Sequence, residues 1–529
     1  MRRSFARNFA LFRRAVRFSA PLFALTFAAA VAWNAVVSSA VADESAAPAK
    51  TAAEEMATET AFDFGAEPLR FIENDRLKVG FDLSIGGAVV YLEDKKYETG
   101  NMINSFDWGR QIQLSYYSGP NPFIGPNGEK PAPHWAGLGW NPIQSGDFGG
   151  VKSKVLEFKK IDDATAFVRT RPQLWPHTGV AAECVFECLY RLTANGFELN
   201  ATIVNNRSDK TQYTGRSQET PALYTNAPWY KLVSYLGDKP FENEPVTVVV
   251  DKRDGKGWPW VNYYTPERWS ALLDENDRGI GVYQPGATQT TAGFHGGDGN
   301  KGASLGPKDG PTGYIAPLEQ TILDWNIRRT YRTTFVVGTL DEIRATACEL
   351  AKKDALQAVP NWTFATDRQN WIYGGTTDAG FPISDCLKIN VVPAGCYAAS
   401  PGYFWRSEDA PILEIDAAFE SADDVSADAP TALSLKIEPV SPADQIDYLG
   451  WSEGDKSVEK DRAEKAKTHP TLAPIIVPVP VDWDGERRTL RVDLSQIDAY
   501  KGAMKKVVID FPKRSGQARL YRVGFVGKN

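Results

Sequence analysis

Apolar and polar residues alternate in short segments from Leu69 to about Leu340. Because successive side chains of a strand point to opposite faces, such alternation predicts strands that are buried on one face. Turn dipeptides, among them Asn127-Gly128, Asp254-Gly255 and Asp309-Gly310, separate the segments. The pattern therefore predicts one large antiparallel β domain.

A second series of alternating segments begins near Val359-Pro360 and runs to the C-terminus. Before it, Thr339 to Leu350 predicts a helix, because Thr339 can cap the first turn and Glu342 follows three residues later. The charged stretch from Ser452 to Lys467 is expected to be a solvated insertion. At 529 residues the chain exceeds one typical core. We predict an all-β protein, with a large antiparallel supersandwich over residues 61–350 and a smaller jelly-roll-like β-sandwich over residues 358–529.

The first 42 residues are typical of an export signal peptide. Six arginines precede an apolar run from Ala20 to Ala32, and Ala40-Val41-Ala42 supplies the small residues of a cleavage site. The apolar stretch continues past Trp33, so an uncleaved membrane anchor is the alternative. Residues 43–60 are rich in Ala, Glu and Thr, which predicts a disordered linker. We expect an exported protein that is periplasmic, extracellular or at the cell surface.

Composition restricts the class of partner. The formal net charge is −7, and charged residues are 24% of the chain, without the basic cluster that nucleic-acid binding requires. Membrane contact is expected only if the N-terminal segment stays uncleaved. Five cysteines leave at least one unpaired: Cys184 and Cys188 are expected in the core, and Cys386 and Cys396 either close a loop or remain free. No cysteine has metal-binding spacing, so a structural zinc site is not expected.

Between Asp107 and Trp269 the chain repeatedly places aromatic rings beside amides, arginines and carboxylates. A pyranose ring stacks its C–H faces on Trp and Tyr, and its hydroxyls need planar polar partners. The alternative is a β core with half-buried aromatic rings whose polar tips are satisfied. The residues expected to bind a polysaccharide or oligosaccharide are Arg110, Gln111, Trp140, Asn141, His177, Arg216, Trp229, Tyr230 and Trp260.

Three residues in these stretches are candidates for proton transfer. Glu219 follows Gln218 and stands two residues before Pro221, which is expected to end the strand, so that Glu219 would face a ligand. Glu267 lies among aromatics that would raise its pKa, although a surface carboxylate paired with Arg268 is the alternative. His134 lies on a long Gly/Pro loop, a place suited to acid–base work or to an ordinary hydrogen-bonded histidine.

The opening of the large domain combines a Gly86-Gly87-Ala88 turn, a strand and a segment bearing Arg110. In these features residues 69–340 resemble galactose-mutarotase-like β-supersandwich domains. The segment from Tyr314 to Gln320 is similar to the Leu-Glu-x-Gln segment of aldose mutarotases, with one residue fewer before the glutamine, and the resemblance implies that Glu319 is a general base.

A second segment departs from the mutarotase pattern. Tyr224-Thr225-Asn226 is similar to the segment that holds an Asn-His pair in mutarotases, but Ala227 stands where the histidine would be, so ring opening is not expected. The end of the chain, from Trp483, resembles jelly-roll sugar-binding modules.

We therefore expect a carbohydrate-active enzyme that cleaves glycosidic bonds, with two carboxylates as its acid and its base or nucleophile: a glycoside hydrolase. One alternative is a polysaccharide lyase acting on uronic-acid glycans, with a His or Tyr base and an arginine such as Arg171 on the substrate carboxylate. Another is a non-catalytic glycan-binding protein. No cofactor is expected, although Asp147, Asp298 and Asp309 in glycine-rich turns have oxygen chemistry compatible with calcium.

Overall fold

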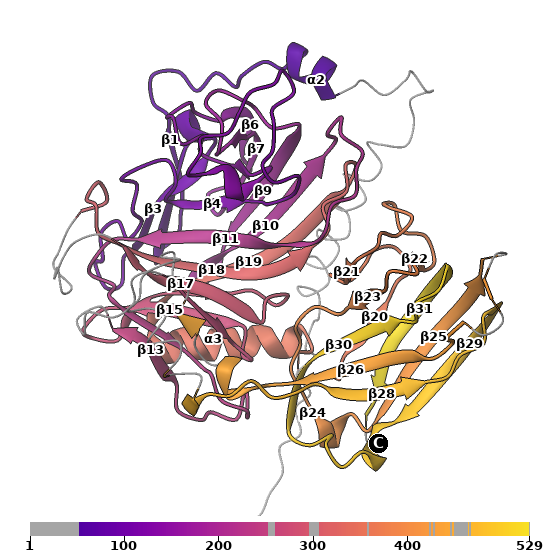
Figure 1. Cartoon of the computed structure of the whole chain (residues 1–529). Coiled ribbons are helices and arrows are strands. Elements are labelled where there is room, and N and C mark those ends of the chain that lie inside the picture. Colours follow the sequence, from indigo (N-terminus) through magenta and orange to yellow (C-terminus); the bar gives the residue numbers. More distant parts are fainter. Residues whose placement is uncertain are drawn as a thin grey trace, which may run out of the picture. The chain divides into compact units, whose positions relative to one another are not determined.

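Two antiparallel sheets form the N-terminal sandwich of the protein (Figure 1). The structure is a computed structural model, and it describes residues 52–251, 260–295, 306–356, 359–422, 425–426, 429–444, 447–448, 464 and 467–527. The first sheet runs in the order β1 (Leu69–Glu73), β2 (Leu77–Asp82), β3 (Ala88–Asp94), β4 (Ile112–Ser115), β11 (Arg216–Thr225), β18 (Thr312–Thr321), β17 (Gln289–His295), β14 (Val261–Tyr264) and β27 (Asp447–Tyr448). Strand β5 (Pro142–Ile143) pairs with β4, and β8 (Gln173–Leu174) pairs with β5. The second runs in the order β13 (Thr247–Asp251), β12 (Lys231–Ser234), β15 (Trp269–Leu273), β16 (Arg278–Tyr283), β19 (Arg328–Thr339), β10 (Gly196–Asn205), β9 (Cys184–Leu192), β7 (Thr165–Arg171) and β6 (Lys154–Lys160).

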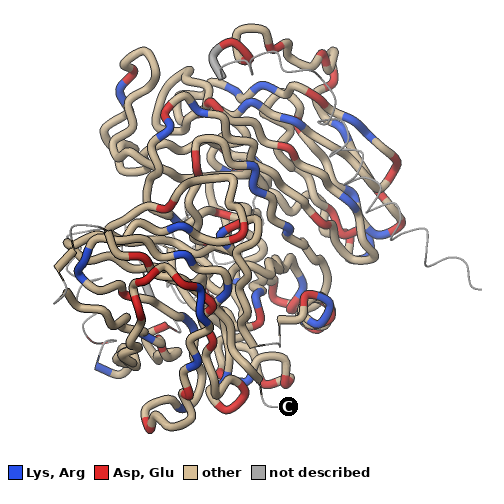
Figure 2. Tube along the Cα trace, turned by 90° about the vertical axis from the view of Figure 1, so that its right-hand side faces the viewer, with Lys and Arg blue, Asp and Glu red and all other residues tan. Residues whose placement is uncertain are grey.

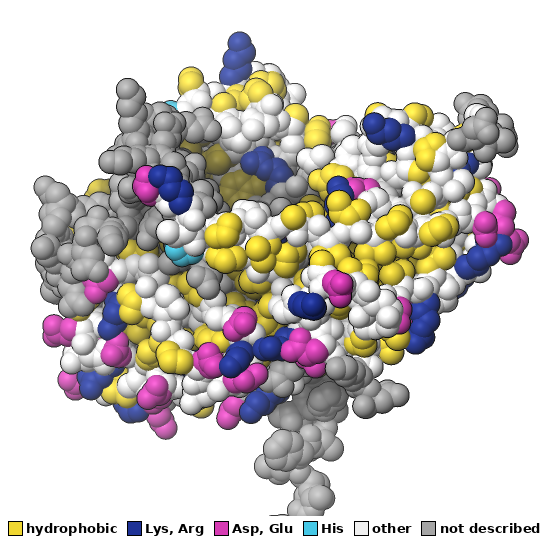
Figure 3. Space-filling view, turned by 60° about the horizontal axis from the view of Figure 1, so that its bottom comes forward, with side chains coloured by type: hydrophobic (Ala, Val, Ile, Leu, Met, Phe, Trp, Pro, Cys, Tyr) yellow, Lys and Arg dark blue, Asp and Glu magenta, His cyan; other side chains and the backbone are white. Residues whose placement is uncertain are grey.

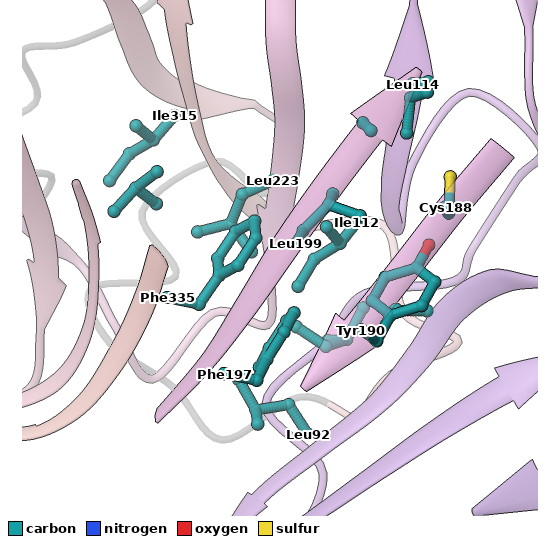
Figure 4. Close-up of a cluster of buried hydrophobic side chains, with 14 of the residues drawn as sticks. Leu92, Ile112, Leu114, Cys188, Tyr190, Phe197, Leu199, Leu223, Ile315 and Phe335 are labelled. Carbon is teal, nitrogen blue, oxygen red and sulfur yellow. The ribbon is translucent and has the colours of Figure 1, made fainter. Parts of the chain in front are cut away.

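The core of this sandwich lies between the two sheets (Figure 4). In β10 the alternate residues Phe197, Leu199 and Ala201 are fully buried, as the period of a strand dictates. Phe197 stacks on Phe335 of β19 with ring centroids 4.6 Å apart. Burial of a Leu or Phe side chain stabilises the fold by about 1.5–3 kcal/mol, so the facing rows of apolar residues fix how the sheets pack.

Two further antiparallel sheets form the C-terminal sandwich. One consists of β20 (Asn361–Thr363), β31 (Gly516–Val526), β25 (Ile412–Ser421) and β29 (Asp484–Asp493), with β22 (Leu387–Val391) beside β31. The other consists of β21 (Ile372–Gly374), β23 (Cys396–Ala399), β30 (Ala503–Phe511), β26 (Leu433–Pro439) and β28 (Ile475–Val479), with β24 (Trp405–Arg406) beside β30. A separate apolar cluster fills the space between them. The all-β fold class is thus confirmed, and a jelly-roll topology for this sandwich stays a prediction.

Helices are few in the described part of the chain. Helix α3 (Leu340–Lys353) follows β19, and the predicted capping box is confirmed, since Thr339 accepts from the Glu342 N–H while Glu342 accepts from the Thr339 N–H. Helix α2 (Ala52–Thr58) lies within residues 43–60, and the linker expected there stays a prediction. Single 3₁₀ turns are η1 (Leu83–Ile85), η2 (Ala136–Leu138), η4 (Ser407–Asp409), η5 (Pro442–Asp444) and η6 (Leu494–Gln496). Among the described residues, no helix has the length and apolar character to span a bilayer.

Polar contacts and one strand join the two sandwiches within residues 52–529. Strand β27, which comes from the C-terminal part of the chain, pairs with β14 of the N-terminal sandwich. Arg368 pairs with Asp378 at 2.7 Å and also with Asp324, which lies between β18 and β19. These contacts hold the start of the C-terminal sandwich against the end of the first sheet. The predicted signal peptide, residues 43–51 and the expected boundary at residue 358 lie outside the described residues.

The cysteines are all free thiols. Cys184 and Cys188 are buried in β9, as expected. Of the two alternatives for Cys386 and Cys396, a disulfide that closes a loop is therefore wrong, and the free thiols are confirmed. Both thiols are buried, and burial raises the pKa of each.

Candidate functional site

The face of the first sheet that points away from the core carries a carboxylate and several aromatic rings; we call it the outer face. Across β11 and β18, Glu219 lies opposite Leu318 and Tyr224 lies opposite Tyr314. Directly opposite residues point to the same face of a sheet. Their neighbour Ile315 points into the core, so Glu219, Tyr224 and Tyr314 share the outer face.

Glu219 is half-buried and held by two tyrosines. The Tyr117 and Tyr314 hydroxyls each donate to Oε1 at 2.9 Å. Burial raises the pKa of Glu219, and hydrogen bonds from the two tyrosines and Ser115 oppose that rise in part. Burial also raises the pKa of Tyr117 and of Tyr314 well above the usual range, so both remain protonated donors at neutral pH. The arrangement suits a carboxyl group that keeps its proton to a higher pH than usual.

Two buried amide side chains hold the backbone beside Glu219 in place. Gln218 is fully buried, accepts from the Tyr117 N–H at 2.6 Å and donates to the Tyr117 carbonyl at 3.0 Å. Asn141, also fully buried, donates to the Tyr116 carbonyl at 2.8 Å and to the Ser115 hydroxyl at 3.3 Å. Because these amides hold the backbone after β4, the Tyr117 hydroxyl has a defined position beside Glu219.

Aromatic rings extend from this carboxylate along the outer face. The Tyr314 ring lies 4.7 Å from that of Tyr224 and 4.6 Å from that of Trp260, both at 41°. Tyr224 and Trp260 are half-buried, so part of each ring reaches the surface. The charges of Glu219 and Asp107 raise the pKa of the Tyr224 hydroxyl, after the larger effect of burial. Such rings suit a flat ligand with C–H faces.

Glu319, the general base implied by the mutarotase resemblance, points to the opposite face of the same sheet. It lies opposite Gln218 in the register, one position from the pair of Glu219 and Leu318, and is 5% exposed. It accepts from Gln284 at 2.8 Å and pairs with Arg329 of β19. Glu219 and Glu319 therefore cannot act together on one bond.

Glu267 is fully buried and belongs to a structural network. It accepts from the Phe241 N–H and from Trp269 Nε1, both at 2.8 Å, and pairs with Arg344 of α3 at 2.9 Å. The surface pair with Arg268 is wrong, because the partner is Arg344 and the carboxylate has no exposure. These contacts favour a role in stability over the predicted catalytic role.

The two loop histidines lie apart from Glu219. His134 is exposed, with its ring 5.7 Å from that of Phe148. His177 is 1% exposed and its Nε2 lies 3.2 Å from the Phe123 carbonyl oxygen. Burial lowers the pKa of His177. Within the described part of the chain, neither histidine hydrogen-bonds to the Glu219 carboxylate.

Most of the residues expected to bind a sugar are buried, and few lie at the outer face. The buried ones, which pack or hydrogen-bond inside the protein, are Gln111, Trp140, Asn141, Trp229 and Tyr230. Arg110 is 6% exposed, pairs with Asp107 at 3.3 Å and donates to Asn104 Oδ1. Arg216 donates to the Leu138 carbonyl at 2.8 Å and lies 5.7 Å from the Tyr117 ring centroid. Only Trp260 and Glu219 of the predicted set belong directly to the aromatic cluster, with Arg110 and Arg216 at its edges.

Tyr224, Tyr314 and Asp107 were not among the predicted site residues. Tyr224 and Tyr314 lie in the two segments that are similar to mutarotase segments. The sequence does not show which face of the sheet each tyrosine occupies, and that information was needed to predict them as site residues. The prediction that Pro221 ends its strand is wrong, because β11 continues through it to Thr225 with an irregularity in register between Glu219 and Leu223.

Charged residues of both signs are mixed over the described part of the chain. Positive and negative residues are interspersed along the trace (Figure 2), and on the face seen in Figure 3 they lie singly or beside opposite charges. No group of three or more His, Cys, Asp or Glu could hold a metal ion among the described residues. Asp147 is fully buried and accepts from the Val151 and Gly179 N–H groups, while Asp298 lies outside the described residues.

No protein-family model matches this chain, and no curated protein matches it either. Solved structures similar to it include a galactose mutarotase-like protein from Lactobacillus casei, at 13% identity and TM-score 0.32 over 51% of this chain and 99% of the other. A galactose mutarotase related enzyme from Lactobacillus acidophilus has 14% identity and TM-score 0.31 over 52% and 99%. A 4-alpha-glucanotransferase from Thermococcus litoralis has 11% identity and TM-score 0.29 over 53% and 39%. Likenesses this distant assign no substrate or reaction to the chain.

Proposed function

We propose that the outer face of the first sheet binds a polysaccharide or oligosaccharide and that Glu219 donates a proton to the glycosidic oxygen during hydrolysis. The observation that carries this proposal is the raised pKa of Glu219 beside a row of aromatic rings. A general acid must hold its proton near the working pH, and burial is the usual way to raise the pKa of a carboxyl group.

Hydrolysis also needs a carboxylate that acts as a base or nucleophile. Asp107 is the best candidate, because its charge and that of Glu219 both act on the Tyr224 hydroxyl. Its side chain is 48% exposed and pairs with Arg110. In this proposal Asp107 activates water, while the half-buried rings of Trp260 and Tyr224 stack on the sugar.

The tyrosines argue against a lyase mechanism at this site. A tyrosine base must lose its proton at the working pH, whereas burial raises the pKa of Tyr117, Tyr224 and Tyr314 well above the usual range. They therefore serve better as hydrogen-bond donors to Glu219. Glycan binding without cleavage needs only the aromatic rings, and the experiment below separates it from hydrolysis.

The test is the Glu219→Gln variant assayed on a panel of neutral and uronic-acid polysaccharides. Loss of a general acid should slow the release of reducing ends by about 10²–10⁴-fold while glycan binding persists. The matched control is Glu349→Gln, an exposed glutamate on α3 that should keep the wild-type rate. Full activity of Glu219→Gln would refute the proposal. Products that absorb as conjugated alkenes would indicate elimination instead, and binding without any product would indicate a binding protein.

We also propose that the protein is exported, with cleavage after Ala42. The proposal rests on the basic, apolar and small-residue regions of the first 42 residues. N-terminal sequencing of protein from the native host should begin at Asp43, whereas an intact Met1 in a membrane fraction would support the anchor alternative.

A further inference from the structure

A cavity of about 390 Å³ opens where the two sandwiches meet. Its walls come from the ends of β18 and β19, from the turn that carries Arg268, and from the segment Trp362 to Tyr403 of the C-terminal sandwich. The volume lies within the range of small-molecule sites. The cavity is distinct from the outer-face cluster, because Glu319 lines it and Glu219 points to the other side of the sheet.

Arg268 is the unusual side chain of this cavity. It is 3% exposed, its φ is +62°, and its guanidinium lies 5.1 Å from the ring centroid of Tyr403. Its Nε has no hydrogen-bond partner, and no carboxylate lies within ion-pair distance among the described residues. The lining also contains four arginines that each have a carboxylate partner: Arg328 with Glu187, Arg329 with Glu319, Arg332 with Asp354, and Arg368 with Asp324 and Asp378.

A buried cation without an anionic partner costs free energy. Burial accordingly lowers the pKa of Arg268. An anion that enters the cavity would remove this cost, and the planar guanidinium matches a carboxylate through two parallel hydrogen bonds. A positive φ at a bulky residue adds backbone strain, which proteins tend to retain at ligand sites.

Polar side chains also line the cavity. They include Gln284, Gln369 and Asn370, whose amides can both donate and accept hydrogen bonds. Glu319 adds carboxylate oxygens that can accept from a ligand hydroxyl. A cavity with both donors and acceptors suits a ligand that carries hydroxyl groups as well as one negative charge.

We propose that this cavity binds a small hydroxylated carboxylate, the chemistry of a sugar acid, with Arg268 as the partner of the carboxylate. A neutral sugar would leave Arg268 unpaired. A sulfate has no hydroxyl group to donate to the Glu319 carboxylate or to the amide oxygens. The proposal does not depend on the reaction at Glu219.

The test is isothermal titration of the full chain with D-glucuronate as the probe. Wild-type protein should bind it saturably, and Arg268→Met should weaken binding by about 10- to 150-fold, the factor that corresponds to a lost charge-assisted hydrogen bond. The matched control is Arg328→Met, which removes an arginine of the same cavity whose charge is already paired with Glu187. It should bind D-glucuronate within about twofold of wild type.

Wild-type protein supplies a second measurement that does not depend on the folding of a variant. In ¹⁵N spectra the Arg268 Nε–H resonance should shift on addition of D-glucuronate and not of D-glucose. Equal binding of D-glucose or of sulfate, unchanged affinity in Arg268→Met, or a static Arg268 resonance would each overturn the proposal. Because Glu219→Gln leaves this cavity intact, loss of hydrolysis in that variant with D-glucuronate binding retained would separate the two sites.

Discussion

The ion pair between Glu267 and Arg344 offers a sharp test of whether Glu267 acts in folding or in catalysis. The carboxylate is fully buried and the guanidinium is 12% exposed, with contacts of 2.9 and 3.1 Å. Two neutral donors, the Phe241 N–H and Trp269 Nε1, complete the set around the carboxylate. The pair joins α3 to the turn before β15, so its loss should loosen the packing of α3 on the second sheet.

The expected cost follows from what each substitution leaves behind. Arg344→Met strands a fully buried carboxylate with two neutral donors, and breaking such a pair costs about 3–5 kcal/mol. Glu267→Gln keeps the size of the side chain and leaves a guanidinium that can turn toward water, so its cost should be near the lower end of that range. The loss of unfolding free energy in the double variant should be smaller than the sum of the two single losses, because both side chains share one interaction.

Urea unfolding followed by tryptophan fluorescence measures these losses, and Trp269 lies in the network itself. The matched control is Arg491→Met, which removes the partner of Glu414 from a pair in which Arg491 is 59% exposed. Such an exposed pair should contribute at most about 1 kcal/mol. A loss in Arg344→Met no larger than in this control would refute the argument from burial. Stable Glu267→Gln protein without glycan cleavage would restore the catalytic assignment.

Three further outcomes are expected. Trp260→Ala should weaken glycan binding at the outer face by more than about 1 kcal/mol, roughly fivefold in Kd by titration, because aromatic anchors dominate such surfaces. The rate of hydrolysis should fall as pH rises through the raised pKa of Glu219, since the carboxyl group then loses the proton that it donates; a pH–rate profile without a fall on the alkaline side would contradict this. The protein should lose stability as pH falls below about 6.5, because burial lowers the pKa of His177 in the folded state and the unfolded chain then binds the proton more tightly. In His177→Gln the urea midpoint should depend less on pH over that range.

Local patterns in the sequence were sufficient for the strands and for α3. The alternation in β10 places Phe197, Leu199 and Ala201 in the core, and the Thr339 and Glu342 capping box starts α3 where the spacing predicts. Both patterns depend on residues within one segment. Such local rules hold because a strand or a helix turn fixes directions only over a few residues.

The long-range partners could not be predicted in this way. Glu267 has Arg268 beside it in the sequence, but its partner Arg344 is distant in the chain and reaches it from α3. Arg268 in turn points to Tyr403 of the C-terminal sandwich. Sequence neighbours suggested a surface pair, whereas tertiary packing separated the two side chains and buried both.

The face on which Glu219 lies shows why the site itself was hard to predict. Glu219 and Tyr224 are five positions apart, an odd number that would place them on opposite faces of a regular strand. The irregularity around Pro221 adds one residue to β11 relative to β18, where the opposite residues Leu318 and Tyr314 are four apart. A single extra residue therefore creates the cluster of Glu219, Tyr224 and Tyr314, and no periodicity in the sequence reveals it.

The same register decides which carboxylates can cooperate. Glu219 and Glu319 come from neighbouring positions of two paired strands, yet side chains one position apart in register point to opposite faces. Glu319 therefore pairs with Arg329 and lines the cavity beside the C-terminal sandwich, whereas Glu219 accepts hydrogen bonds from the tyrosines of the outer face. A second carboxylate for chemistry at Glu219 must come from a loop that borders the outer face, which is where Asp107 lies. For this reason the Asp107→Asn variant, and not a variant of Glu319, should share the rate loss of Glu219→Gln.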